Sequence, residues 1–288
     1  MLEHHETASE SNWYGFESRV ERNTNRILEC LDEARVKATF FCLGWIARAH
    51  PQVIKAICAA GHEVGSHSDR HLLVNQMTQR QFRDDLHTSI ACLEDLTGQR
   101  VRAFRSPGFS ISRESIWAFS ILAENELEWD SSVFASSHSH NRQPSLDITG
   151  PATLEWRGMR LKQFPVVPGR ALGRDISFSG GGYFRLLPYG VVRYLMSNSA
   201  YAMTYFHPRD FDPHQPRIPN LPLYRVFKSY VGLSSALDKF KAFLREFHFI
   251  DISEANERLD WDNLPTIRLD CTLSSLPHVG RSLCSPVA

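Results

Sequence analysis

Short apolar runs alternate with amphipathic helical stretches through most of the chain, and this alternation limits the fold strongly. The apolar run at residues 38–43 (ATFFCL) predicts a buried strand, and Pro51 then suits the first turn of a helix. A second short strand is expected at residues 62–66. Thr78 and Gln81 have the spacing of a capping box, which predicts the start of a further helix. Strands that alternate with helices in this way indicate an α/β fold with a largely parallel sheet.

The alternation continues toward the C-terminus. Residues 101–104 and 201–206 are predicted as strands and residues 112–126 and 235–247 as helices, and a last strand is expected at 249–252. We expect three segments: a polar N-terminal segment at 1–17, one α/β domain at 18–260, and a disordered C-terminal tail at 261–288 that is rich in Ser, Leu and Pro.

The composition excludes several classes of function. Hydrophobic residues make up 42% of the 288 residues, so the chain can bury a full core. Thirty-two basic residues balance thirty-two acidic ones, which gives no bulk electrostatic case for a nucleic-acid partner. No stretch reaches the ~18 apolar residues of a membrane span. The N-terminus does not resemble a secretory signal, and the six cysteines include no C-x-x-C pair, so a cytoplasmic location is expected.

Two histidines four residues apart follow the strand expected at residues 62–66. His67 and His71 can converge on one metal ion if the chain turns into a helical loop there. Two solvated loop histidines would give the same pattern. Two imidazoles also make an incomplete site, and the third ligand, normally a carboxylate, is not identifiable in this chain.

Three further residues follow or border predicted strands and could take part in chemistry. Arg105 stands before a Pro-Gly turn and could orient a carboxylate, although a surface arginine would look the same. His207 follows the strand at 201–206 and could act as a general acid, or could be a core-edge histidine bonded to the backbone. Asp130 could fix the tautomer and charge of such a histidine, or could be a turn aspartate.

Three consecutive glycines at positions 180–182 look at first like a phosphate-binding loop. They lack the Lys-Ser/Thr of a P-loop and follow no clear strand, so nucleotide binding is not expected. Glycine instead allows the backbone to pass close to another group, such as a sugar, or to shape the rim of a groove.

Five ordered blocks of the sequence, taken together, resemble a known family. They are ESRVERNTNRILECLDEARVKATFFCLGWIARAHPQVIKAICAAGHEVGSHS, TGQRVRAFRSPGFSISRESIWA, WDSSVF, SGGGYFRLLPY and YFHPRDFDP. The chain from about Trp13 to Asn256 is similar to the NodB-homology polysaccharide deacetylases. It is more similar to the subfamily encoded in exopolysaccharide loci beside exosortase and PEP-CTERM systems.

The resemblance implies a fold, a metal and a reaction. The fold would be a distorted (β/α) barrel, and a divalent metal, often zinc, would be held by one aspartate and by His67 and His71. Arg105 would steady the catalytic base, His207 would be the general acid, and Asp130 would lie behind it. The implied reaction is the hydrolysis of acetyl groups, N-acetyl above all, on an acetylated polysaccharide.

The sequence departs from the family pattern at its start. The first strand of the family carries a Val-Asp-Val-Glu-Asp-like segment with the base and the metal aspartate, and no aspartate precedes Asp32 here. We therefore expect a barrel that lacks its first strand and an activity that is impaired in this form. Two alternatives follow: a non-catalytic descendant that binds polysaccharide or a partner protein, and a hydrolase of small cyclic amides.

Overall fold

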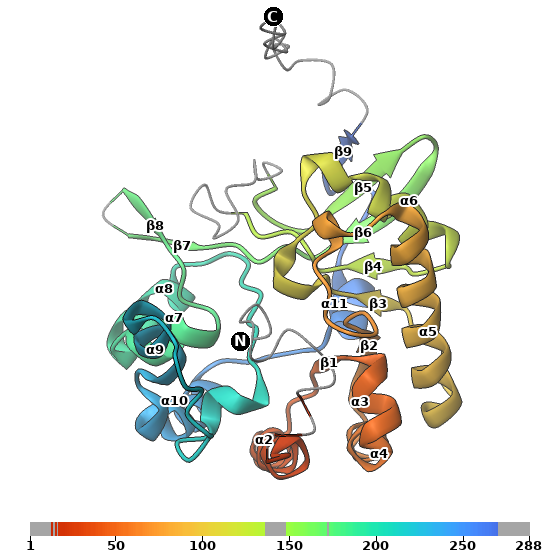
Figure 1. Cartoon of the computed structure of the whole chain (residues 1–288). Helices are drawn as coiled ribbons and strands as arrows, with labels where there is room; N and C mark the ends of the chain where they lie inside the picture. The colour runs from red at the N-terminus through yellow and green to blue at the C-terminus, as the bar shows by residue number, and fades with distance from the viewer. Residues whose placement is uncertain (1–12, 14, 16, 136–147, 172, 270–288) are drawn as a thin grey trace, which may run out of the picture.

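A seven-stranded, mostly parallel sheet forms the centre of the protein, as seen in a computed structural model (Figure 1). The structure describes residues 13, 15, 17–135, 148–171 and 173–269. The strand order in the sheet is β1-β2-β3-β4-β6-β5-β9, and β7 (Gly169–Ala171) and β8 (Arg174–Ile176) form a separate hairpin. Within the described residues β1 and β9 are therefore the two edges of the main sheet.

The first four strands run parallel to one another and follow the predicted alternation with helices. They are β1 (Thr39–Cys42), β2 (Glu63–Ser66), β3 (Ala103–Phe104) and β4 (Trp129–Asp130). The intervening helices are α3 (Gly44–Ala49), α4 (Pro51–Ala59), α5 (Gln79–Thr97) and α6 (Trp117–Glu124). Apolar side chains of α4, α5 and α6 pack against the strands in the largest core cluster. The predicted α/β class with a mostly parallel sheet is confirmed.

The capping box expected at the start of α5 is present. The Thr78 side chain accepts a hydrogen bond from the backbone N–H of Gln81, and the Gln81 side chain accepts one from the backbone N–H of Thr78. This pair satisfies two backbone donors that the first turn of a helix leaves without partners. Phe82 and Leu86 follow on the inner face and are fully buried.

The far half of the sheet contains the antiparallel pair β5 (Ala152–Trp156) and β6 (Met159–Gln163). The last strand, β9 (Thr266–Arg268), pairs with β5 in parallel. This strand corrects the expectation that the whole segment 261–288 lacks structure, because Leu269 behind it is buried as well. The remainder of that segment, 270–288, lies outside the described residues.

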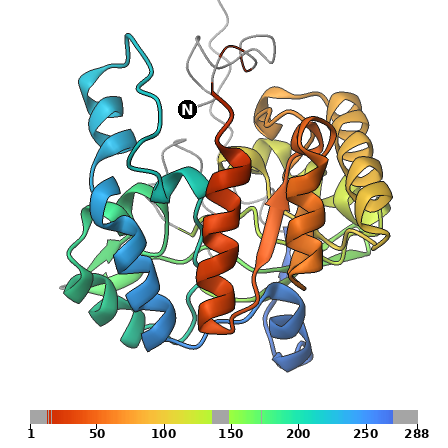
Figure 2. The same cartoon turned by 90° about the horizontal axis from the view of Figure 1, so that it is seen from below.

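A second core cluster lies beside the sheet and is built mainly from helices. Helix α2 (Val20–Ala34) packs there against α10 (Leu233–Glu246), with phenylalanines from several segments between them. Figure 2 shows α2 in the middle of the near face, with α10 on one side and α3 and α4 on the other. Three shorter helices, α7 (Gly181–Leu186), α8 (Tyr189–Ser197) and α9 (Leu223–Tyr230), lie on the same side as α10 in Figure 1.

Two predicted strands are wrong in type. The segment 201–206 contributes only an isolated bridge between Tyr205 and Gly180. In place of a strand at 249–252, Asp251 caps helix α11 (Ile252–Arg258) by accepting a hydrogen bond from the backbone N–H of Glu254. Apolar runs this short do not distinguish a strand from a buried connection.

Among the residues that the structure describes, none of the helices has both the length and the apolar character needed to cross a membrane.

Candidate functional site

Polar residues follow three neighbouring parallel strands at the point where each strand ends. His67 comes directly after β2, Arg105 after β3, and Ser131 after β4. The order β2-β3-β4 in the sheet places these three positions at one edge, which is the rim where α/β proteins assemble their sites. The structure thus brings His67 and Arg105 together at this edge of the sheet.

His67 and His71 lie side by side, with their ring centroids 5.0 Å apart and their planes nearly perpendicular. The Nδ1 of His67 is 2.7 Å from the backbone carbonyl oxygen of Arg105. Because a carbonyl can only accept, Nδ1 carries the proton in the neutral ring and Nε2 keeps its lone pair. Histidine ligands of metal ions are commonly oriented by such a bond from the second ring nitrogen.

The loop between the two histidines is tightly constrained. Ser68 and His71 both have positive φ angles, of 72° and 59°, and the Ser68 hydroxyl accepts a hydrogen bond from the backbone N–H of His71. Asp69 is buried and receives two hydrogen bonds from Arg48, of 2.6 and 3.0 Å. A side chain at Gly44 would place its Cβ 2.3 Å from the Asp69 carboxylate, so only glycine allows this approach. The loop therefore has one well-defined shape that holds both imidazoles.

Burial keeps both imidazoles neutral at physiological pH. Desolvation, followed by the nearby His71, lowers the pKa of His67 well below its usual value. Desolvation, followed by the charge of His207, lowers the pKa of His71 to about 4. Neutral imidazoles with free lone pairs are the form that binds a metal ion. The charge of His207 also contributes to lowering the pKa of both His67 and His71.

The pair meets part of the requirement for a divalent metal site. A catalytic zinc ion usually has three protein ligands. Among the described residues, no group of three or more His, Cys, Asp or Glu side chains is placed so that it could hold a metal ion. Two imidazoles of suitable tautomer and protonation state therefore fit a metal ion, while the third ligand is not found in the part of the chain that the structure describes.

Arg105 is buried at the rim and is held by the strand end beside it. Its Nε donates to the backbone oxygen of Ser131 at 3.1 Å and its Nη2 donates to the Ser131 hydroxyl at 2.7 Å. The guanidinium also lies over the ring of Phe41, 4.5 Å from the centroid. Burial lowers the pKa of Arg105 to about 10, which leaves the group charged at neutral pH. A buried cation in a polar and aromatic frame can orient a carboxylate or polarise a carbonyl group.

Asp130 is fully buried at the end of β4. Its two oxygens accept hydrogen bonds from the Ser132 backbone N–H at 2.8 Å and from the Ser132 hydroxyl at 2.5 Å. Burial raises the pKa of Asp130 to about 7, against the lowering effect of these bonds. No hydrogen bond or ion pair between Asp130 and His207 occurs within the described residues. The prediction that Asp130 stands behind His207 stays a prediction.

His207 opens the 3-10 turn η4 (Pro208–Phe211), and a different carboxylate lies next to it. The Nδ1 of His207 is 3.5 Å from Oδ2 of Asp210, and the same oxygen accepts the backbone N–H of His207 at 2.9 Å. The imidazole is 58% exposed, whereas the Asp210 side chain is 6% exposed. A solvent-accessible ring with a buried carboxylate at Nδ1 is a suitable arrangement for a proton donor.

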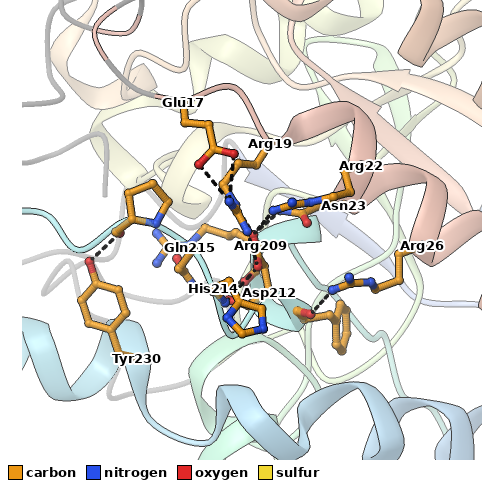
Figure 3. Close-up of polar contacts among 12 residues, drawn as sticks. Glu17, Arg19, Arg22, Asn23, Arg26, Arg209, Asp212, His214, Gln215 and Tyr230 are labelled. Atoms are coloured by element: carbon orange, nitrogen blue, oxygen red, sulfur yellow. Dashed lines mark hydrogen bonds and ion pairs between the residues drawn. The ribbon is translucent and has the colours of Figure 1, made fainter.

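The segment that carries His207 is tied to helix α2 by a second carboxylate (Figure 3). Asp212 is buried and receives hydrogen bonds from Arg19 Nε at 2.6 Å, Arg19 Nη2 at 3.0 Å and Asn23 Nδ2 at 2.9 Å. Glu17 binds the same guanidinium from its outer side, as Figure 3 also shows. These contacts fix the segment after His207 to the first helix of the fold.

The glycine run at 180–182 permits a close backbone contact, as its composition suggested. A Cβ on Gly180 would lie 2.3 Å from the backbone oxygen of Tyr205. Tyr205 donates its N–H to Ser179, and its carbonyl accepts from Gly181. The close neighbour is thus the segment leading to His207, and this segment is held in place without belonging to a strand of the sheet.

Two residues near His207 were not recognised from the sequence. The His-x-x-Asp spacing around Pro208 is a capping signal that could have identified Asp210. Arg185, which lies 3.2 Å from the other oxygen of Asp210, carries no such local signal because it comes from helix α7.

Comparison with known families divides the chain into two parts. Residues 5–123 match the polysaccharide deacetylase family. Residues 131–257 match a domain of unknown function, DUF3473. His67, His71 and Arg105 fall in the first match, and His207 and Asp210 fall in the second.

Several proteins similar to part of the chain are named as peptidoglycan deacetylases. The chain is 29% identical over 106 residues to a peptidoglycan-N-acetylglucosamine deacetylase of Bacillus cereus, covering 37% of this chain and 34% of the relative. It is 36% identical over 92 residues to the peptidoglycan-N-acetylglucosamine deacetylase PgdA of Listeria monocytogenes, covering 32% of this chain and 20% of the relative. The match thus spans about a third or less of the length of these relatives.

Among the solved structures that align with most of the chain is one with a similar fold. It is a Mycobacterium smegmatis protein classed with the polysaccharide deacetylases, with a TM-score of 0.56 and 21% identity. The alignment covers 92% of this chain and 82% of that one, which shows that the two proteins share a fold.

Proposed function

Because residues 5–123 match the polysaccharide deacetylase family, we propose that the chain is a metal-dependent hydrolase that removes acetyl groups, N-acetyl above all, from a polysaccharide. The observation that carries the proposal is the arrangement at the rim of the sheet. Two neutral imidazoles, a buried guanidinium and an accessible histidine with a carboxylate partner meet there. These are the groups that the hydrolysis of an amide requires besides a base.

His67 and His71 would hold a divalent metal, which we propose to be zinc. Nε2 of His67 is the free nitrogen, because Nδ1 is bound to the carbonyl of Arg105. When bound there, such a metal supplies electrophilic stabilisation of an acetyl carbonyl and an activated water. The relatives matched here act on peptidoglycan. For this chain we propose an exopolysaccharide as the acetylated substrate.

The protein side chains would then orient the substrate and move the proton. Arg105 has a fixed position and a retained charge, so it can hold a carboxylate or the acetyl oxygen in one orientation. His207 can donate a proton from Nε2 to the amine nitrogen as the carbon–nitrogen bond breaks, because its Nδ1 faces Asp210.

Acetate release tests the proposal directly. The protein is treated with a chelator and then supplied with Zn²⁺, Co²⁺ or Mn²⁺, and acetate is measured with N-acetylglucosamine oligomers and with acetylated exopolysaccharide. We expect metal-dependent release that falls at least about 100-fold in His67→Ala and in His207→Gln. His87→Ala is the matched control, since His87 is exposed on α5 and remote from the rim.

Two outcomes would count against the proposal. Release that is equal in His67→Ala and in the unmodified protein would show that the histidine pair is not the metal site. No release with any metal or substrate, combined with glycan binding that persists in His67→Ala, would favour a non-catalytic polysaccharide-binding protein.

A further inference from the structure

Helix α9 presents apolar side chains to solvent. Leu223 is 87% exposed, Tyr224 66% and Phe227 56%. Seven large hydrophobic residues are exposed among the described residues, and three of the seven fall within these five positions of one helix. Successive residues of a helix are about 100° apart around its axis, so the three side chains share one face. Scattered apolar residues are ordinary on a protein surface, whereas a cluster of them indicates a contact with another surface.

Basic side chains border this apolar face. Lys228 is exposed on the same helix, and Arg225 donates from Nε to the Tyr224 hydroxyl at 3.1 Å. Together with the exposed Arg217 they give the stretch 213–237 three cations, and its sequence contains no Asp or Glu. The whole chain has equal numbers of basic and acidic residues, so this excess of positive charge is local.

The acidic residues that flank the stretch do not cancel its charge. Asp210 and Asp212 precede it, but their side chains are only 6% and 1% exposed, and each lies beside an arginine. On the other side the first carboxylate is Asp238, which belongs to the next helix, α10. The surface formed by residues 213–237 therefore combines apolar groups with positive charge.

Polar contacts hold the last turn of α9, while its apolar side chains stay outside the core. All eight residues of the helix are at least partly exposed. The Tyr230 hydroxyl accepts the N–H of Ile218 at 2.8 Å and donates to the carbonyl of Pro216 at 3.2 Å. The Nη atoms of Arg185 donate, all at 3.0 Å, to the carbonyls of Lys228, Ser229 and Val231. Figure 2 shows α9, in light blue at the upper left, extending beyond the end of α10. The helix is thus fixed at one end and presents its apolar face outward.

We propose that α9 binds the surface of a membrane that contains anionic lipids. The three apolar side chains would enter the boundary between head groups and acyl chains, and the three cations would contact lipid phosphates. The most exposed of the apolar residues is a leucine, which gains free energy by leaving water but offers no flat ring on which a sugar could stack. This favours lipid over polysaccharide as the partner. None of these apolar and basic side chains belongs to the rim of the sheet, so the inference does not rest on the proposed function.

Flotation with lipid vesicles tests the proposal on the full chain. One set of vesicles contains phosphatidylcholine alone, and the other contains phosphatidylcholine with about 30% phosphatidylglycerol. We expect binding to the anionic vesicles to be at least about tenfold stronger than to the neutral ones. Raising the salt from about 0.1 M to about 0.5 M should weaken it, because the contacts with phosphate are screened.

Substitutions of the apolar face should remove the binding. In the double variant Leu223→Ser/Phe227→Ser we expect a loss of at least about tenfold, since less apolar surface can leave water. The double variant Leu223→Ile/Phe227→Leu keeps the face apolar and should retain most of the binding. These side chains are exposed, so the fold should tolerate both changes, and far-UV circular dichroism checks that it does.

Substitutions of the basic residues test the electrostatic part. Arg225→Gln/Lys228→Gln should lower binding to the anionic vesicles by about 20-fold, as each cation near such a surface contributes about fivefold. The matched control is Lys55→Gln/Arg80→Gln, which removes the same charge from exposed positions of α4 and α5. The control should bind as the unmodified protein does.

Three results would overturn the proposal. The first is flotation of Leu223→Ser/Phe227→Ser that equals that of the unmodified protein. The second is a dimer in analytical ultracentrifugation that this variant abolishes, without vesicle binding by the unmodified protein; the face would then belong to a second copy of the chain. The third is retention on acetylated polysaccharide that the variant abolishes, again without vesicle binding. Acetate release is a separate measurement, so its absence would reject the proposed function and leave the vesicle result unaffected.

Discussion

Asp130 shows how burial alone can set the charge of a residue near a site. Its side chain is fully buried and its pKa is raised to about 7. At a pH between the ordinary pKa of an aspartate and this raised value, the carboxyl group is protonated in the folded protein and ionised in the unfolded chain. Between about pH 4 and pH 7 the folded state therefore holds more protons than the unfolded state. Stability that comes from this residue must fall as the pH rises through that range.

Comparison with Asp130→Asn isolates this effect. The asparagine keeps the shape and can still accept the Ser132 N–H, but it does not titrate. Urea unfolding gives the free energy of unfolding of both proteins at each pH. From pH 4 to pH 8, the unmodified protein should lose on the order of 2–4 kcal/mol of stability relative to the variant. Titration of His67 and His71 is common to both proteins and cancels. A difference that is constant with pH would show that Asp130 stays ionised when buried.

Some site residues can be recognised from the sequence immediately around them, whereas others depend on contacts between distant parts of the chain. His67 and Arg105 were predictable because each stands directly after a run that could be recognised as a strand, and His71 follows His67 by four residues. The Arg185–Asp210 contact joins residues 25 positions apart through helix α7, and no pattern in one sequence reports such a pair. Asp130 was singled out as a possible partner of a histidine or a turn aspartate, and its contact with Ser132 lies only two residues away.

At the scale of elements, the segment with His207 is fixed by side chains and by one close backbone approach rather than by a sheet. Asp212 and Arg19 connect it to α2, and Gly180 lets it approach the start of α7. The sequence predicted a strand at 201–206 because its apolar composition is that of a strand, although only Tyr205 makes a bridge. Before residue 130, strands β1 to β3 and the longer helices were recovered, because those helices have a cap or an apolar period of their own, whereas the short helix α3 and strand β4 were not predicted.

A double-mutant cycle measures how strongly the segment is connected to α2. Arg19→Ala, Asp212→Ala and the double variant are compared by urea unfolding. Because two hydrogen bonds join the side chains at a partly solvated position, we expect a coupling free energy of about 1 kcal/mol. Glu17→Ala is the control, since Glu17 binds the same guanidinium from solvent and should couple weakly with Asp212. Additive effects of Arg19→Ala and Asp212→Ala would contradict a direct connection.

At the scale of the whole molecule, α2 joins two core clusters into one unit. Ile27, Cys30 and Leu31 belong to the helical cluster, whereas Val20 and Leu28 pack against the cluster beside the sheet. The family comparisons divide the chain near residue 130, but α2 lies in the first part and packs on α10 in the second. The two matched regions therefore share a core and are expected to unfold together.

Phe243→Ala tests this cooperation. The residue is fully buried in the helical cluster, with ring centroids of Phe184 and Phe249 at 5.4 and 4.9 Å. Its truncation should cost about 3–5 kcal/mol. All six tryptophans lie outside that cluster, so their fluorescence reports on the remainder of the fold. We expect the tryptophan transition in urea to shift together with the far-UV circular dichroism. An unshifted tryptophan transition would mean two independently folding units.

The packing of α2 on α10 also affects how the chain folds during its synthesis. Some 200 residues separate the two helices in the chain. At a synthesis rate of roughly 5–20 residues per second, α2 leaves the ribosome about 10–40 seconds before its partner. During that interval the part of its apolar surface formed by Ile27, Cys30 and Leu31 lacks the helical cluster that covers it in the native protein. Nascent chains of this protein should therefore engage a chaperone through the segment Val20–Ala34, and release should wait until α10 has been made.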